Sequence, residues 1–290
     1  MSQTARQAEA LGGHLPPLLV AAERVAATVA QGVHGRRRVG QGDSFWQFRP
    51  FVSGDSASRI DWRVSARTSR TFVRETEWEA AQTVCLWRDG GASMRWKSRE
   101  AAVLKADRAG LILLALAALL LRGGERVRLL GSDTRTVAGR AGLDRIADEL
   151  QRLPPTDDGL PPEVKLPRHA RVVLIGDLFS PLDRIQAAIA KLVAVPVTGT
   201  VLQILDPAEA MLPYSGRVRF QGVTVAETTL IPRVENVRAE YTRRLAAQQH
   251  GIAAICAAAG WGCAVHRTDH PPEAALLALY TSLMPATGRR

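Results

Sequence analysis

The chain has 290 residues, of which 46% are hydrophobic and 23% are charged, which is the composition of an ordinary globular protein. It is long enough to bury a large core in one large domain or two. The longest apolar run, residues 111–121, lies between Arg108 and Arg122 and is too short to cross about 30 Å of hydrocarbon. Residues 1–13 lack the pattern of a signal peptide. We therefore expect a cytoplasmic protein without a membrane span, while peripheral attachment to a membrane stays open.

The net charge of +10 is unusual, and nearly all of the positive charge is arginine. Residues 36–74 contain nine arginines and three aspartates, so this segment alone carries a net charge of +6. Clustered basic charge suggests a nucleic acid, an anionic membrane surface or an acidic protein as the partner. A genome biased towards arginine codons explains the overall composition equally well, but it explains the clustering less well.

The N-terminal part is predicted to be a helix followed by an irregular region. Residues 15–31 form an alanine-rich amphipathic pattern that ends at Gly32 and Gly35, and such a helix is expected to pack on the body of the protein. Aromatic residues in segment 44–51 suggest a small aromatic core. We therefore predict two parts, residues 1–80 with the helix and an irregular motif region, and residues 81–290 with an α/β domain.

Residues 51–75 carry the most distinctive pattern in the chain. Gly54-Asp55 and the serines that follow indicate a turn and a helix cap. Arginines then recur every three or four residues, a spacing that would align them as a ridge on one helical face. They are Arg59, Arg63, Arg67, Arg70 and Arg74. Asp55, Asp61 and Trp62 lie where they could pair with or pack on this ridge, which favours an internal brace over a docking surface or a solvated basic helix.

These residues resemble the signature of the DUF58 family. The segments that carry the resemblance are Phe48-Arg49-Pro50-Phe51, Gly54-Asp55, Arg59-Ile60-Asp61-Trp62, Ala66-Arg67 and Val73-Arg74-Glu75. In that family the motif precedes a von Willebrand factor A-like (vWA-like) domain, and the resemblance implies a MoxR-type AAA+ ATPase as the partner. It implies no reaction, because the family has no agreed one.

From residue 83 onwards, predicted strands alternate with predicted helices, which is typical of an α/β domain with a mainly parallel sheet. The predicted strands are 83–87, 126–130, 171–175, 197–205 and 263–266, and the predicted helices are 98–121, 143–153, 183–193, 234–259 and 271–284. An edge hairpin is expected around 134–137 and a second hairpin in 213–231. The expected fold is a vWA-like, doubly wound sheet with helices on both faces.

Two predicted strands end in an acidic residue, Asp89 and Asp177. In doubly wound sheets ligands bind outside the carboxyl ends of the strands, and the vWA resemblance implies a site for Mg²⁺ or another divalent cation there. The family loop Asp-x-Ser-x-Ser corresponds here to residues 89–93, where Asp89 and Ser93 match but Gly91 replaces a hydroxyl ligand. The expected site is therefore degenerate, with Asp89, Ser93 and Asp177 as its ligands. Alternatively, Asp89 and Ser93 cap the long helix that follows.

Other patterns offer no catalytic constellation. The chain has no GxxxxGK[ST], GxGxxG or GxSxG motif, and its three cysteines form no CxxC pair. His266, Asp269 and His270 are interpreted as part of a surface loop, and Cys85 as an inert residue of a core strand. In segment 206–212, Asp206 and Glu209 resemble a stretch found in the family, and capping at the strand end is the plainer interpretation.

The function that these observations favour is a non-enzymatic adaptor that works with a MoxR-type AAA+ ATPase in protein assembly, maturation or stress response. The first alternative is a basic nucleic-acid-binding protein, motivated by the charge cluster and its interleaved aromatic residues, although no nucleic-acid-binding motif supports it. The second is a metal-dependent enzyme that uses Asp89 and Asp177, against which the missing ligand at Gly91 counts.

Overall fold

The computed structural model describes residues 17–33, 45–52, 60–68, 70–76, 81–133, 135–155, 158–223 and 227–283. They belong to two compact units, one formed by the N-terminal helix together with the chain from Gln82 onwards and one lying within His34–Ala81. The prediction grouped the N-terminal helix with the motif region, whereas in the structure this helix, α2 (Pro17–Val33), packs against helices of the larger unit.

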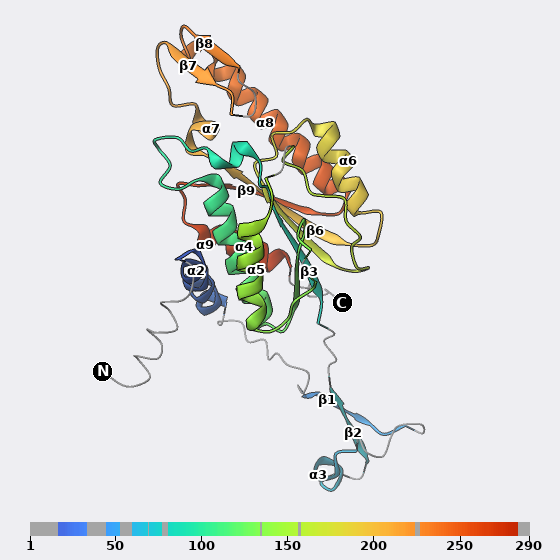
Figure 1. Cartoon of the computed structure of the whole chain (residues 1–290). Helices are drawn as coiled ribbons and strands as arrows, with labels where there is room; N and C mark the ends of the chain where they lie inside the picture. The colour runs from blue at the N-terminus through green and yellow to red at the C-terminus, as the bar shows by residue number, and fades with distance from the viewer. Residues whose placement is uncertain are drawn as a thin grey trace, which may run out of the picture. The chain divides into compact units, whose positions relative to one another are not determined.

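The larger unit is built on a five-stranded, wholly parallel sheet (Figure 1). Its strands lie in the order β4-β3-β5-β6-β9. Their bounds are Arg126–Leu129 for β4, Thr83–Arg88 for β3, Arg171–Gly176 for β5, Thr198–Leu205 for β6 and Gly262–Arg267 for β9. After β3 the chain moves to one side for β4 and returns to the other side for β5, so the order reverses between β3 and β5. In such a sheet this switch point is where ligands bind.

Helices cover both faces of the sheet (Figure 1). One face carries α2, α4 (Lys105–Arg122), α5 (Ala141–Arg152) and α9 (Pro272–Ser282), and the other carries α6 (Leu182–Leu192) and α8 (Glu235–Ala258). Side chains of β3 alternate between the faces, Val84 and Leu86 towards α4 and Cys85 and Trp87 towards α6 and α8. The doubly wound architecture expected from the sequence is therefore confirmed.

Helix α4 is apolar around most of its circumference because it lies between the sheet and the other helices of its face. Among the described residues, no helix combines the length and the apolar character needed to cross a membrane.

Three shorter elements follow β6 in the larger unit. Helix α7 (Pro207–Met211) directly follows β6, and a hairpin of β7 (Val218–Gln221) and β8 (Thr228–Ile231) precedes α8. A 3-10 turn, η2 (Ala92–Arg95), lies between β3 and α4. The expected helix 98–121 begins only at Lys105, and residues 98–104 form a loop in which Asp206 accepts the N–H of Ser98. At the expected edge hairpin, the structure has a single bridge between Val127 and Val137.

The smaller unit contains an antiparallel pair, β1 (Phe45–Pro50) and β2 (Phe72–Thr76), and the helix α3 (Trp62–Ser65). The cap of α3 is Asp61, whose Oδ1 accepts the N–H groups of Arg63 (3.1 Å) and Val64 (3.0 Å). The serines expected to cap a helix, Ser56 and Ser58, lie outside the described residues. With only four residues, α3 is also too short to align an arginine ridge from residue 59 to residue 67.

Candidate functional site

Three neighbouring strands of the sheet end in a buried aspartate. Asp89 follows β3, Asp177 follows β5 and Asp206 follows β6, and their exposed fractions are 0%, 3% and 0%. The parallel order of the strands brings all three to the carboxyl edge of the sheet, at and beside the switch point. Asp89 and Asp177 lie at the ends of the adjacent strands β3 and β5.

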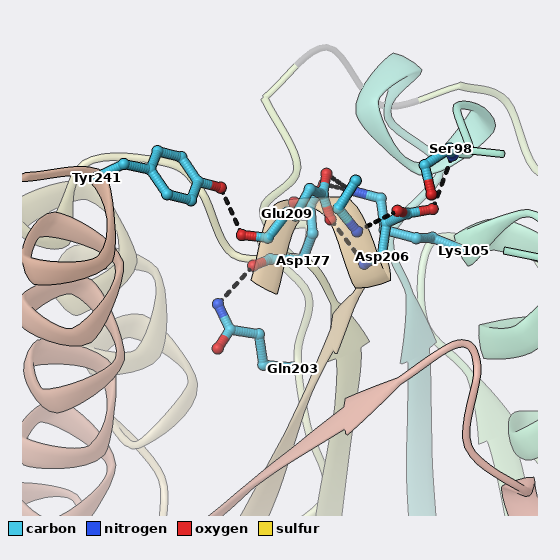
Figure 2. A network of polar contacts seen from close by, with 8 residues as sticks. Ser98, Lys105, Asp177, Gln203, Asp206, Glu209 and Tyr241 are labelled. Atoms are coloured by element: carbon cyan, nitrogen blue, oxygen red, sulfur yellow. Dashed lines mark hydrogen bonds and ion pairs between the residues drawn. The ribbon is translucent and has the colours of Figure 1, made fainter. Parts of the chain in front are cut away.

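The carboxylate of Asp177 is paired with a lysine (Figure 2). Nζ of Lys105, the first residue of α4, lies 2.9 Å from Oδ2 of Asp177 and 2.5 Å from Oε1 of Glu209. The side chain of Lys105 is fully buried, and the ring of Phe179 lies with its centroid 5.3 Å from the ammonium nitrogen. One cation therefore joins the start of α4, the end of β5 and helix α7.

The third aspartate, Asp206, organises the backbone around it. Its Oδ1 accepts the N–H of Ala208 at 2.8 Å, and Glu209 Oε2 in return accepts the N–H of Asp206 at 2.8 Å, which is a capping box for α7. Its Oδ2 accepts the N–H of Ser98 from the loop before α4, at 2.9 Å. The interpretation of Asp206 and Glu209 as capping residues is thus confirmed, but Glu209 also binds Lys105.

Further hydrogen bonds fix the residues around this centre. The hydroxyl of Tyr241 on α8 donates to the carbonyl oxygen of Glu209 at 2.5 Å, and Nε2 of Gln203 donates to the carbonyl oxygen of Asp177 at 2.8 Å (Figure 2). Burial, with the nearby charge of Glu209, raises the pKa of Tyr241 to about 12, so this hydroxyl stays protonated as a donor.

Charge at the centre is unevenly balanced. Burial raises the pKa of Glu209, the pairing with Lys105 opposes that rise, and the charge of Asp177 adds to it. Two carboxylates share one ammonium, so the electrostatic gain from Lys105 has to offset the desolvation of both.

Asp89 lies in a tighter environment. Its Oδ1 accepts the N–H of Gly91 at 2.7 Å. A Cβ at Gly159 would lie 3.0 Å from its Oδ2, and one at Gly176 would lie 2.8 Å from its Cβ. Gly159 has a φ of +62°, so glycine there serves both the backbone conformation and the close approach to Asp89.

The geometry fits a divalent cation poorly. Of the three predicted ligands, Asp177 is engaged by Lys105, Asp89 faces the two glycines, and Ser93 is half-buried in η2. Within the described ranges, no cluster of three or more histidine, cysteine, aspartate or glutamate side chains could hold a metal ion. Asp89 and Ser93 do not cap the long helix either, because η2 and the loop 98–104 separate them from it.

Sequence reasoning missed Lys105. The chain has only four lysines, and one of them begins α4, a helix whose residues are mostly buried. A cation in the first turn of a helix opposes the helix dipole, and that unfavourable position was the available signal.

The arginine motif is placed only in part. Asp55 and Arg59 lie outside the described residues, and Arg74 pairs through its backbone with Phe48 in the β1–β2 ladder. On α3 and in the turn after it, Trp62 is 68% exposed and Arg63 and Arg67 are exposed as well. In the part of the motif that the structure describes, Asp61 caps α3 and forms no ion pair with an arginine.

A separate cavity of about 640 Å³ lies between α6 and the described parts of the proline-rich loop, residues 153–155 and 158–164, with Trp87 and Leu130 also lining it. Two exposed ion pairs link the loop to α6 at this cavity, Arg184 with Asp158 at 2.9 Å and Lys191 with Glu163 at 2.7 Å. Neither Lys105 nor Asp177 contributes to its lining, so the cavity is distinct from the acidic edge of the sheet.

Comparison with known proteins gives a family and distant structural likenesses. The family model described as "Protein of unknown function DUF58" matches residues 47–251. The chain is similar to the conserved hypothetical protein BatB from Bacteroides thetaiotaomicron, with 12% identity and a TM-score of 0.36 over 70% of this chain and 97% of that one. It is also similar to an aerotolerance-related membrane protein from Bacteroides fragilis, with 12% identity and a TM-score of 0.34 over 70% and 98%. A search of curated proteins found no match.

Proposed function

Because the chain belongs to the DUF58 family, whose description assigns no function, we propose a function from its own residues. The protein is a non-enzymatic adaptor that binds a MoxR-type AAA+ ATPase and serves protein assembly, maturation or a stress response. The class of partner comes from the resemblance of the arginine motif, and the binding surface comes from the geometry of α3.

The observation that carries the proposal is the exposure of Trp62. A tryptophan that is 68% exposed, beside the exposed Arg63 and Arg67, is an uncommon arrangement on a protein surface. Tryptophan and arginine are the residue types most enriched at the energetic centres of protein interfaces. The net charge of +6 in residues 36–74 suits an acidic surface on the partner.

The carboxyl edge of the sheet supports a binding role over a catalytic one. Lys105, Asp177, Asp206 and Glu209 are engaged with one another or with backbone N–H groups. The ammonium of Lys105 is held by two carboxylates, and Asp206 and Glu209 accept backbone N–H groups, so these side chains serve to position the loops at this edge.

The test is affinity capture from nuclease-treated native lysate, with proteins identified by mass spectrometry. The baits are the wild type, Trp62→Ala and Arg63→Glu/Arg67→Glu. We expect the wild type to recover a MoxR-type AAA+ ATPase and each variant to recover about tenfold less, because loss of an interface centre costs roughly 1.4 kcal/mol or more. The matched control is Arg243→Glu/Arg244→Glu, which reverses two adjacent arginines with side-chain exposures of 77% and 79% on α8.

Three outcomes would contradict the proposal. Equal recovery by all baits would remove α3 from the interface. A lower unfolding midpoint of both α3 variants, with recovery unchanged, would identify Trp62 and the arginines as an internal brace. Co-purifying nucleic acid before nuclease treatment, with no ATPase recovered, would favour the nucleic-acid-binding alternative, whose affinity should fall steeply with salt.

A further inference from the structure

The position of Lys105 is energetically unfavourable unless specific partners compensate its positive charge. It is the first residue of α4, where the helix dipole repels a cation, and its exposed fraction is 0%. Burial of an ammonium group is costly unless carboxylates pair with it closely. The pairs with Asp177 and Glu209, at 2.9 and 2.5 Å, supply this compensation.

The partners of Lys105 come from the two loops that bear ligands at the edge of such a sheet. Asp177 follows β5 at the switch point, and Glu209 lies on α7, directly after β6. Phe179 covers the ammonium on a further side, with its ring centroid 5.3 Å away. A magnesium ion needs about six oxygen ligands at roughly 2.0–2.1 Å, and it could not reach Asp177 and Glu209 in this way while Nζ of Lys105 lies between them.

We propose that Lys105 is an internal counter-ion that takes the place of a divalent cation at this edge. The ammonium joins the start of α4 to the ends of β5 and β6, so the loops hold their positions without a metal. Removal of the ammonium would leave Asp177 and Glu209 as a latent cation site. This inference does not depend on the proposed adaptor function.

The experiment compares the wild type with Lys105→Met, which keeps most of the length of the unbranched side chain and removes its charge. Thermal unfolding is followed with and without millimolar Mg²⁺ or Mn²⁺, against sodium chloride of equal ionic strength. The wild-type midpoint should not respond to either divalent cation. Lys105→Met should unfold about 10 °C lower, because one partner of a buried ion pair is lost, and Mn²⁺ should restore part of that shift.

The matched control is Lys191→Met, which breaks the exposed pair with Glu163. It should shift the midpoint by no more than about 2 °C and should not respond to Mn²⁺. If Lys105→Met unfolds no earlier than this control, Lys105 is not a structural counter-ion. If Mn²⁺ leaves Lys105→Met unchanged, the carboxylates are not a latent cation site.

Two further measurements keep the proposal testable if Lys105→Met does not fold. The double variant Lys105→Met/Glu209→Gln removes one of the two orphaned carboxylate charges and so returns the site to its wild-type net charge, which should recover soluble, folded protein; failure to do so would contradict the charge balance. Calorimetric titration of the wild type with MnCl₂ should show no saturable binding. Saturable binding that Asp177→Asn abolishes would show that a metal binds beside Lys105 and would overturn the inference.

Discussion

A buried histidine is expected to make the protein sensitive to mild acid. His266 lies on β9 with 5% of its surface exposed, and its Nε2 has no hydrogen-bond partner among the described residues. The pKa of His266 is lowered from 6.5 to about 4, mainly by burial; the positive charges of Arg108 on α4 and of His270 contribute to the lowering, and Asp269 opposes it. His266 is therefore neutral at pH 7, and protonation of this buried ring is expected to destabilise the folded chain.

The direction and size of the effect follow from the difference between the folded and unfolded pKa. The unfolded chain binds a proton at His266 near pH 6.5, whereas the folded chain resists it until about pH 4, so stability falls as the pH drops through this window. The difference between a pKa of 6.5 in the unfolded chain and about 4 in the folded chain corresponds to an upper limit of about 3 kcal/mol, which relaxation of the protein around the charged ring would reduce. We expect a measured loss of about 2 kcal/mol.

The measurement is urea unfolding of the wild type and His266→Leu at a series of pH values from about 7.5 to about 4.5. His266→Leu fills the site without a titrating group. Over the same pH range this variant should therefore lose about 2 kcal/mol less stability than the wild type. His250→Gln, which changes an exposed histidine on α8, should keep the wild-type pH dependence. Parallel pH profiles for the wild type and His266→Leu would refute the reasoning and would mean that acid loosens another part of the fold.

Two further substitutions, each paired with a control variant, test the fold in urea. Asp206→Ala removes the cap of α7 and leaves the buried N–H of Ser98 without its acceptor, so it should lower the free energy of unfolding by about 2–4 kcal/mol. The control Asp183→Ala, at an exposed first-turn position of α6, should cost less than about 0.5 kcal/mol. Equal losses for the two variants would contradict the role given to Asp206. Gly199→Ala should cost about 1–3 kcal/mol, because its Cβ would lie 2.4 Å from the ring of Trp261. Gly110→Ala, whose Cβ would meet no atom closer than 3.6 Å in the middle of α4, should be neutral or stabilising by up to about 1 kcal/mol, and a loss there as large as at Gly199 would show that the steric argument is wrong.

Much of the α/β unit could be predicted because its signals are local. Each predicted strand is a short apolar run bounded by turn residues, and each lies within about two residues of the strand observed. The largest error is the start of α4. Residues 98–104 look helical in sequence, but Asp206 holds the N–H of Ser98 from a position 108 residues away. A contact over that separation leaves no trace in a local pattern.

In the motif region, by contrast, local patterns predicted the wrong structure. Spacing alone predicted a helix with a serine cap and an arginine ridge, whereas Asp61 caps a helix of four residues that ends before Arg67. The period of three or four residues was real, but the chain turns back into β2 before a ridge can form. Ile60 and Val73 already pair across this turn.

The choice of lysine at position 105 is explained by the two buried carboxylates with which it pairs at the carboxyl edge of the sheet. Only four of the 38 basic residues are lysines, and the other three are exposed, so the single buried one is not a product of composition. An ammonium group is a compact point charge, whereas a guanidinium is planar and would need a wider space between Asp177 and Glu209. The two carboxylates lie 72 and 104 residues from Lys105, so only the fold brings them together. In a chain whose other basic residues are almost all arginines, the buried lysine at position 105 supplies the cation that pairs with the carboxylates of Asp177 and Glu209.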